Sequence, residues 1–264
     1  MKPKPILSSC DWIAYFYENA QTAAREVKPP ATPDLPDDVR QVIAASLPAW
    51  QLGETSDGRH LRAAARQYAD KQNDPAFLSA VELFIREEQR HGAALGEWLD
   101  RVGIPRKSRD VGDSLFRFCR YALPNHAVWA SVVVMVESMA EIYYGAVRPL
   151  TSCPRLQAEC ERILGDEVRH IQFQCEHLAA ARRRVPRFWR RVLSAGEAAF
   201  YGVVCLAVWV AHGRLLRQAG LKAGDFARAA GGKFRAAQRL MDPERYDFPR
   251  EWKRPVGFPI RVRD

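Results

Sequence analysis

Two segments of the chain carry the same five-residue pattern of ionisable side chains. Residues 87–91 read Glu-Glu-Gln-Arg-His, and residues 166–170 read Asp-Glu-Val-Arg-His. Residues three positions apart lie about one turn apart on the same face of an α-helix. The second acid and the histidine of each segment can therefore direct a carboxylate and an imidazole to one place. Both groups suit iron and manganese, so each segment can supply half of a metal site.

Two single glutamates extend this pattern. Glu54 precedes Glu88, and Glu137 precedes Glu167, by similar distances along the chain. Each gap is long enough for half a helix, a short loop and half of an antiparallel helix. Two Glu-x-x-His pairs, together with one glutamate from each of two further helices, are typical of carboxylate-bridged di-metal four-helix bundles.

An alternative interpretation treats these residues as solvated helix faces and surface ion pairs. It accounts for each residue alone, but not for the apolar residues around them. Phe84, Leu95 and Trp98 share the helix face of the first Glu-x-x-His pair. Buried carboxylates and imidazoles are costly without a partner, and a metal ion satisfies several of them at once.

With these motifs, residues 48–184, about half of the chain, resemble the ferritin-like di-iron carboxylate superfamily. This superfamily includes rubrerythrins, ribonucleotide reductase small subunits and di-iron oxygenases. The resemblance implies a bundle that binds two iron ions, or one iron and one manganese, with O₂ as co-substrate. Carried over residue by residue, it implies the following metal ligands: Glu54, Glu88, His91, Glu137, Glu167 and His170.

Four neighbouring residues are predicted to support these ligands. Glu87 and Asp166 directly precede the motif glutamates and can accept the free ring N–H of a ligand histidine. Arg90 and Arg169 occupy the same position in both motifs and are predicted to brace these acids. Simple surface ion pairing is the alternative for all four.

Two residues on the helix of Glu137 are predicted as catalytic candidates. Glu141 lies one turn further on. It is a candidate extra ligand, a carboxylate that takes part when a ligand changes its binding mode, or a nearby acid that does not bind metal. Tyr144 lies about two turns further on, where it can serve as a redox-active or hydrogen-bonding neighbour. An ordinary core tyrosine is the alternative for Tyr144.

The predicted fold is all-α: a ferritin-like four-helix bundle with additional N- and C-terminal helices. Proline, glycine and apolar periodicity divide the chain into N-terminal helices and a Pro-rich linker at 1–47, the bundle at 48–185 and a C-terminal helical extension at 186–264. Within these segments, helices are predicted at 11–27, 36–47, 48–71, 75–102, 114–122, 124–148, 154–185, 188–218 and 222–240.

Charge and cysteine content bear on partners and location. The formal net charge is +9, and arginines are densest between Arg182 and Arg191. The stretch from Ala198 to Ala211 carries no charge, but it is shorter than the ~20 residues that span a bilayer. An anionic membrane surface, tRNA, a carrier protein or a homodimer partner all fit these features, and an ordinary solvated face is the alternative for the arginines. Because no Cys-x-x-Cys occurs, we expect free thiols and a cytoplasmic protein, with a peripheral membrane location as an option.

Three functional classes follow. The favoured one is a non-haem di-iron oxygenase or oxidase that acts on a small-molecule or carrier-bound organic substrate and takes electrons from an external donor. The second is a peroxidase or iron-handling protein of the rubrerythrin and ferritin kind. The third is a ferritin-like binding or membrane-associated module without catalysis. A fold does not by itself choose among these functions.

Overall fold

The computed structural model describes residues 4–26, 35–109 and 126–248, and within them the protein is all-α apart from one minimal strand pair. The predicted helix at 114–122 lies outside these ranges. Strand β1 (Lys4–Pro5) pairs in parallel with β2 (Tyr246–Asp247), which joins the two ends of the described chain. The all-α prediction is confirmed.

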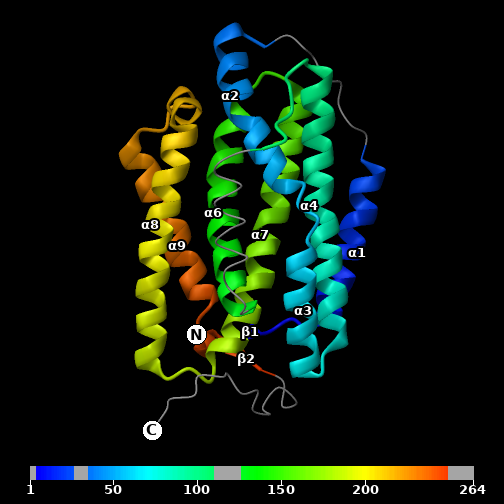
Figure 1. Ribbon diagram of the computed structural model, residues 1–264, viewed down its shortest axis with the longest axis vertical. Helices are drawn as coiled ribbons and strands as arrows, with labels where there is room; N and C mark the ends of the chain where they lie inside the picture. Colours follow the sequence, from blue (N-terminus) through cyan, green and yellow to red (C-terminus); the bar gives the residue numbers. More distant parts are fainter. Residues whose placement is uncertain (1–3, 27–34, 110–125, 249–264) are drawn as a thin grey trace.

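Three long helices form the centre of the molecule (Figure 1). These are α4 (Pro75–Arg101), α6 (His126–Leu150) and α7 (Pro154–Arg182), all close to their predicted bounds. Helix α4 begins where Asp74 accepts a hydrogen bond from the Phe77 N–H at 3.2 Å, with Pro75 at the first helical position. Proline is favoured there because that N–H has no partner within the helix.

The predicted helix over 48–71 is wrong, as is the predicted helix end before Pro48. Helix α2 (Asp37–Glu54) runs through Pro48, and a separate helix α3 (Arg59–Gln72) follows a short loop. Proline disfavours a helix before it, but Ile43 and Leu47 are fully buried, and tertiary packing supplies most helical stability. The break comes at Gly58, whose φ of 66° lies in the left-handed region that glycine tolerates.

The remaining helices flank this centre on two sides (Figure 1). Helix α1 (Ser9–Arg25) packs on α4, and it begins earlier than predicted because Ser8 and Asp11 form a reciprocal capping box. On the other side, α8 (Arg187–Gln218) packs on α2 and α6, and α9 (Ala223–Leu240) packs on α6, α7 and α8. A one-turn 3₁₀ helix, η1 (Pro243–Arg245), leads into β2.

Two described helices are long and apolar enough to cross a bilayer by length and composition. They are α6 and α8. The apolar window of α6 is 83% buried, which is expected of a core helix, whereas that of α8 is only 6% buried. Both windows are apolar, so composition does not explain why one is buried and the other exposed. The difference in burial comes from how other helices pack around each of them.

Candidate metal centre

The structure brings all six predicted ligands together. Their ligand atoms form two overlapping groups, each within 4.8 Å: Glu54, Glu88, His91 and Glu167 make one, and Glu88, Glu137, Glu167 and His170 make the other. Glu88 and Glu167 belong to both groups, so they lie between two potential ion positions. Five of the six side chains are buried, and Glu88 is 19% exposed.

Close approach of α2 to α4 positions Glu54, the last residue of α2. A Cβ added at Gly92 would lie 2.8 Å from Thr55 Cγ2 and 3.1 Å from the Glu54 carbonyl carbon. Gln51 also donates a hydrogen bond to the Gly92 carbonyl oxygen at 3.1 Å. Gly92, directly after the first motif, therefore lets the end of α2 reach the site. No motif in the sequence marks this glycine.

Each of the two candidate ligand histidines is held by an acid from the opposite motif. His91 Nε2 lies 2.8 Å from Asp166 Oδ2, and His170 Nε2 lies 3.0 Å from Glu87 Oε2. A neutral imidazole that donates from Nε2 carries its lone pair on Nδ1. The paired acids therefore favour the tautomer with the proton on Nε2. They also orient each ring so that the Nδ1 lone pair faces the carboxylate cluster.

The Nδ1 atoms of both histidines are buried and make no hydrogen bond. That of His170 lies 2.7 Å from Glu88 Oε1, and that of His91 lies 3.9 Å from Glu54 Oε2. A lone pair facing a carboxylate oxygen is repelled unless a proton or a cation lies between them. Four carboxylates would balance the charge of two divalent ions, and two neutral imidazoles complete the donors. The residues present therefore fit a pair of metal ions.

Three acids of the cluster, Glu54, Glu88 and Glu167, have a raised pKa, which favours their protonated forms when no cation compensates them. Burial raises the pKa of Glu167 to about 7. Burial and the nearby Glu88 charge raise the pKa of Glu54 well above its usual value. Burial alone disfavours a charged imidazole, but Glu88 and the other acids around it raise the pKa of His170 well above its usual value. Metal binding would therefore displace protons from this site.

Asn19 of α1 joins the two supporting acids. Its Nδ2 donates to Glu87 Oε1 at 2.6 Å and to Asp166 Oδ1 at 2.7 Å. Burial alone would raise the pKa of Asp166, but hydrogen bonds from His91 and Asn19 hold this pKa below its usual value. The sequence offered no signal for Asn19, because it lies on a helix outside both motifs.

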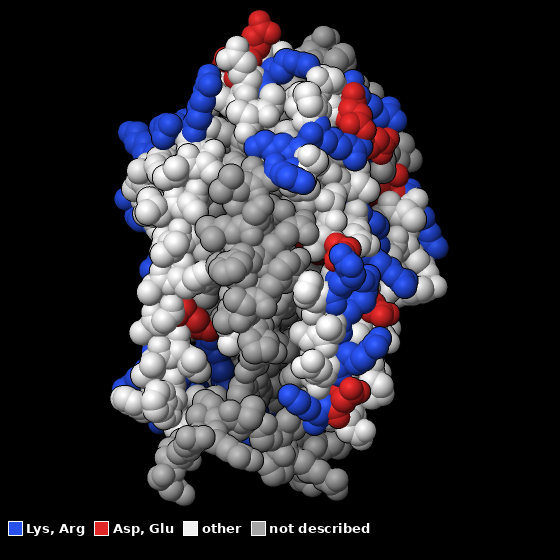
Figure 2. Space-filling view, viewed as in Figure 1, with Lys and Arg blue, Asp and Glu red and all other residues white. Residues whose placement is uncertain are grey.

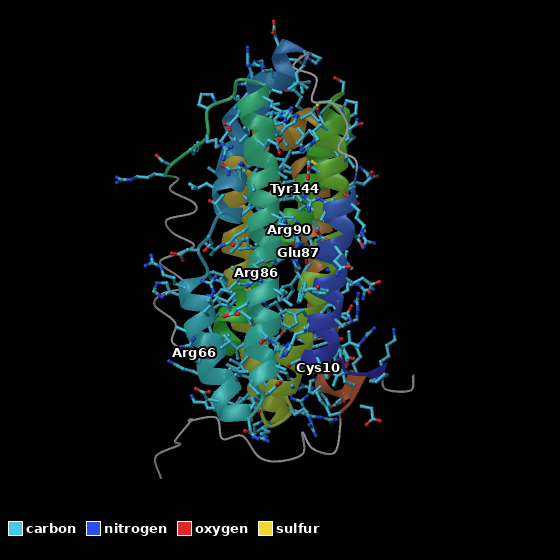
Figure 3. All side chains as sticks on the ribbon, turned by 90° about the vertical axis from the view of Figure 1, so that its right-hand side faces the viewer. Cys10, Arg66, Arg86, Glu87, Arg90 and Tyr144 are labelled. Atoms are coloured by element: carbon cyan, nitrogen blue, oxygen red, sulfur yellow. The ribbon has the colours of Figure 1, made fainter. Side chains whose placement is uncertain are left out.

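The two motif arginines behave differently. Arg90 pairs with Glu87, and Figure 3 shows these residues at neighbouring levels of α4. Arg169, predicted to brace Asp166, instead donates to Gln172 Oε1 at 3.0 Å and stacks over Tyr15. Arg162, one turn before Asp166, is the arginine near that acid, at 3.8 Å.

Of the two catalytic candidates, Tyr144 contacts the carboxylate cluster and Glu141 does not. The hydroxyl of Tyr144 is buried and donates to Glu54 Oε1 at 2.8 Å. Burial and the Glu54 charge raise the pKa of Tyr144 well above its usual value, so its phenol stays protonated. Glu141, the candidate extra ligand, lies outside both ligand groups and forms an ion pair with Lys233 of α9 at 2.6 Å. The side chain of Glu141 therefore lies toward α9 and away from the cluster.

A cavity of about 390 Å³ adjoins the cluster. Glu54, Glu88 and Glu137 contribute to its wall, and most of the remaining lining is apolar. Its apolar walls come from α2, α4, α6 and α8, including Trp50, Phe84, Trp129, Val133, Phe200, Val204 and Val208. A cavity that joins potential metal ligands to an apolar wall suits an apolar organic molecule.

The protein is thus an all-α chain with buried carboxylate and imidazole groups that could hold metal ions. Hydrogen bonds across α4 and α7 orient both imidazoles. Comparison with protein-family models and with curated proteins gives no match for this chain, so the geometry of the site carries the functional argument.

Proposed function

We propose that the protein is a ferritin-like di-iron oxidoreductase that uses O₂ to oxidise or hydroxylate an apolar organic substrate. A centre with one iron and one manganese is the alternative metal content. One observation carries the proposal: two ligand groups share Glu88 and Glu167, and each group includes an imidazole whose Nδ1 has no hydrogen bond.

The ligands divide into three roles in this proposal. Glu54 and His91 would hold one ion, and Glu137 and His170 would hold the other. Glu88 and Glu167 would lie between the ions because they belong to both groups. Oxygen-rich ligands with two imidazoles suit iron and manganese better than soft metals such as Cu(I).

Residues around the ligands keep them in position. Asp166 and Glu87 hold the two imidazoles by Nε2, and Asn19 ties these acids together. The Tyr144 phenol holds one oxygen of Glu54 and keeps a proton next to the site. Such outer partners typically change metal affinity or activity by about 10- to 100-fold when they are removed.

A bound iron pair would supply electrons for the reduction of O₂. For a hydroxylation, the substrate C–H bond, O₂, two electrons from an external donor and two protons yield the alcohol and water. The apolar cavity beside Glu54, Glu88 and Glu137 favours this chemistry over iron storage, because it can hold an organic molecule near the ions. The electron donor and the substrate are expected to be separate molecules.

The test is the metal content and optical spectrum of protein purified from iron-supplemented cells, before and after reduction and exposure to air. We expect about two irons per chain and a ferric absorption that bleaches on reduction and returns with O₂. His170→Ala should lose most of the metal. His177→Gln is the matched control: His177 is buried on the same helix but bonds to the Phe173 carbonyl oxygen instead.

Two results would contradict the proposal. A folded wild-type protein that takes up no iron or manganese after anaerobic reconstitution would leave the site without its ions. A His170→Ala variant that keeps two ions per chain would show that the ligands lie elsewhere. In either case the cluster would be a buried network of acids that share protons with histidines.

A further inference from the structure

The outer face of α8 is apolar and exposed. Phe188 is 67% exposed, Leu206 64% and Val210 76%. Figure 1 places α8 at one edge of the molecule, and Figure 2 shows mainly uncharged atoms along the middle of this edge. Exposed apolar surface of this extent on a single helix marks a contact with a partner or a membrane.

No charged side chain interrupts this face between Arg191 and Arg214. Apart from His212, Glu197 is the single acidic or basic residue in that stretch of α8. It turns inward, where it pairs with Arg182 and accepts hydrogen bonds from Ser131 and Gln238. The uncharged outer face therefore extends for roughly 30 Å at 1.5 Å per residue.

The inner side of α8 fastens the helix to the rest of the protein. Leu215 and Leu216 are buried, and the Tyr201 hydroxyl donates to the Ala230 carbonyl oxygen of α9 at 3.2 Å. A helix fixed along one side cannot cross a bilayer without taking its charged neighbours with it. It can lie along a bilayer surface with its outer face in the interfacial region.

Arginines stand at both ends of this face. Arg187 is 77% exposed and Arg191 is exposed, and Arg191 has no partner within the part of the chain that the structure describes. Arg214 and Arg217 are exposed at the other end. A helix with an apolar face and basic ends suits the interface of an anionic membrane, where guanidinium groups reach lipid phosphates.

The same charges disfavour a second copy of this chain as the occupant. Pairing two α8 faces antiparallel brings the Arg187 end of one copy against the Arg214 end of the other. Pairing them parallel brings each end against itself. Both arrangements place arginines opposite arginines, and the net charge of +9 adds to the repulsion.

The exposed face also adjoins the cavity. Val203, Ala207 and Ala211 are exposed residues of α8, and each also lines the cavity that Glu54 and Glu137 reach from the other side. We infer that the outer face of α8 docks the protein on an anionic lipid bilayer, from which an apolar substrate reaches the cavity. The substrate part rests on the proposed function, whereas the docking depends on α8 alone.

Co-sedimentation of the full-length, metal-loaded protein with vesicles tests this inference. Vesicles of phosphatidylcholine alone are compared with vesicles that also contain phosphatidylglycerol, at low and at high salt. The wild-type protein should pellet with the anionic vesicles at low salt. The double variant Leu206→Asp with Val210→Asp should bind at least about tenfold more weakly, because two carboxylates would enter the apolar interface. Tyr17→Asp, an exposed residue of α1 on the opposite side, is the matched control.

A charge variant gives an independent readout that leaves the apolar face unchanged. Arg191→Gln should weaken binding to anionic vesicles about fivefold. Arg66→Gln on α3, away from α8, should have little effect. Circular dichroism of each variant reports whether it is folded, and because both arginines are exposed we expect native spectra.

Three outcomes would overturn the docking. These are wild-type protein that stays in the supernatant with anionic vesicles, binding that Arg191→Gln and the aspartate pair leave unchanged, and a wild-type dimer that the aspartate pair splits. The last would identify α8 as a contact between copies. Metal content is measured on the same samples, so vesicle binding without metal would contradict the proposed function but not the docking.

Discussion

His91 on α4 donates its Nε2 proton to Asp166 on α7, and the two atoms lie 2.8 Å apart. This bond joins the imidazole of one motif to the acid that begins the other. The same relationship recurs between His170 and Glu87 at 3.0 Å. Two helices thus fix each other's histidines, and both Nδ1 atoms face the carboxylate cluster.

Replacing Asp166 with Asn should weaken metal binding about 10- to 100-fold, because an amide is a poorer acceptor than a carboxylate for the His91 N–H. The measurement is competition with a chelator of known affinity. Glu97→Gln is the control, since Glu97 is a partly exposed acid on the same helix as His91 that pairs with Arg101 and Arg155. Equal affinities of Asp166→Asn and wild type would argue against this support of His91.

Asn19→Ala should destabilise the protein by about 1–3 kcal/mol, because Glu87 and Asp166 each lose a buried donor. Chemical denaturation with and without metal measures this loss. Thr22→Ala on the same helix serves as control, since its hydroxyl donates to the Glu18 carbonyl oxygen on the exposed side. An Asn19→Ala variant as stable as Thr22→Ala would mean that water replaces the amide.

Gly92→Ala should cost about 1–3 kcal/mol and lower the metal content, because its Cβ would press on Thr55 and on the backbone of Glu54. In contrast, Gly165→Ala has open space around its Cβ and should stabilise α7 by about 0.5–1 kcal/mol. Thermal unfolding and metal analysis of both variants provide the comparison. Full metal content in a stable Gly92→Ala protein would refute the close-approach argument.

The metal-free protein should lose stability as the pH rises from about 6.5 to 8. Burial raises the pKa of Glu167 to about 7, so folding favours its protonated form, and this contribution disappears as pH passes through that value. The raised pKa of His170 acts in the same direction. Glu167 alone contributes on the order of 1 kcal/mol across this range.

Denaturant titrations of metal-free protein at the two pH values measure this effect, and Glu167→Gln should reduce it. His177 opposes this trend only weakly: burial lowers its pKa to about 4, so it is neutral in the folded protein across the range, and its unfolded imidazole loses only about half a proton above pH 6.5. Metal affinity should change in the opposite sense and increase with pH, since binding displaces protons. A metal-free protein that gains stability toward pH 8 would contradict the prediction.

Tyr144→Phe should leave the protein folded but change the optical spectrum of the iron-loaded protein and its rate of reaction with O₂. The reason is that Glu54 loses its phenol donor. Tyr143→Phe is a matched control, because Tyr143 is equally buried but its hydroxyl contacts the Ser46 hydroxyl at 2.9 Å. If both variants behave alike, Tyr144 is an ordinary core tyrosine.

Local periodicity made much of the site predictable from the sequence. The 3.6-residue repeat of a helix places Glu88 with His91, and Glu167 with His170, on common faces whatever surrounds them. The apolar residues near these pairs indicated burial. Helix bounds marked by strong local signals, such as Asp74 and Pro75, also agreed with the structure.

Contacts between helices could not be obtained this way. Asn19 lies at the site because α1 packs on α4. Glu141 lies away from the site because it pairs with Lys233 of α9. Helix α2 continued through Pro48 because burial of Ile43 and Leu47 overrode the local effect of the proline, and the break came at Gly58 instead.

The sequence by itself therefore determined which carboxylates and imidazoles share a helix face, because that property depends only on spacing along one helix. Tertiary structure alone decided which acid holds which histidine, which candidate residues face the cluster and which apolar helix is left exposed. These depend on how helices lie against one another. The apolar windows of α6 and α8 illustrate the difference: one is 83% buried and the other 6%.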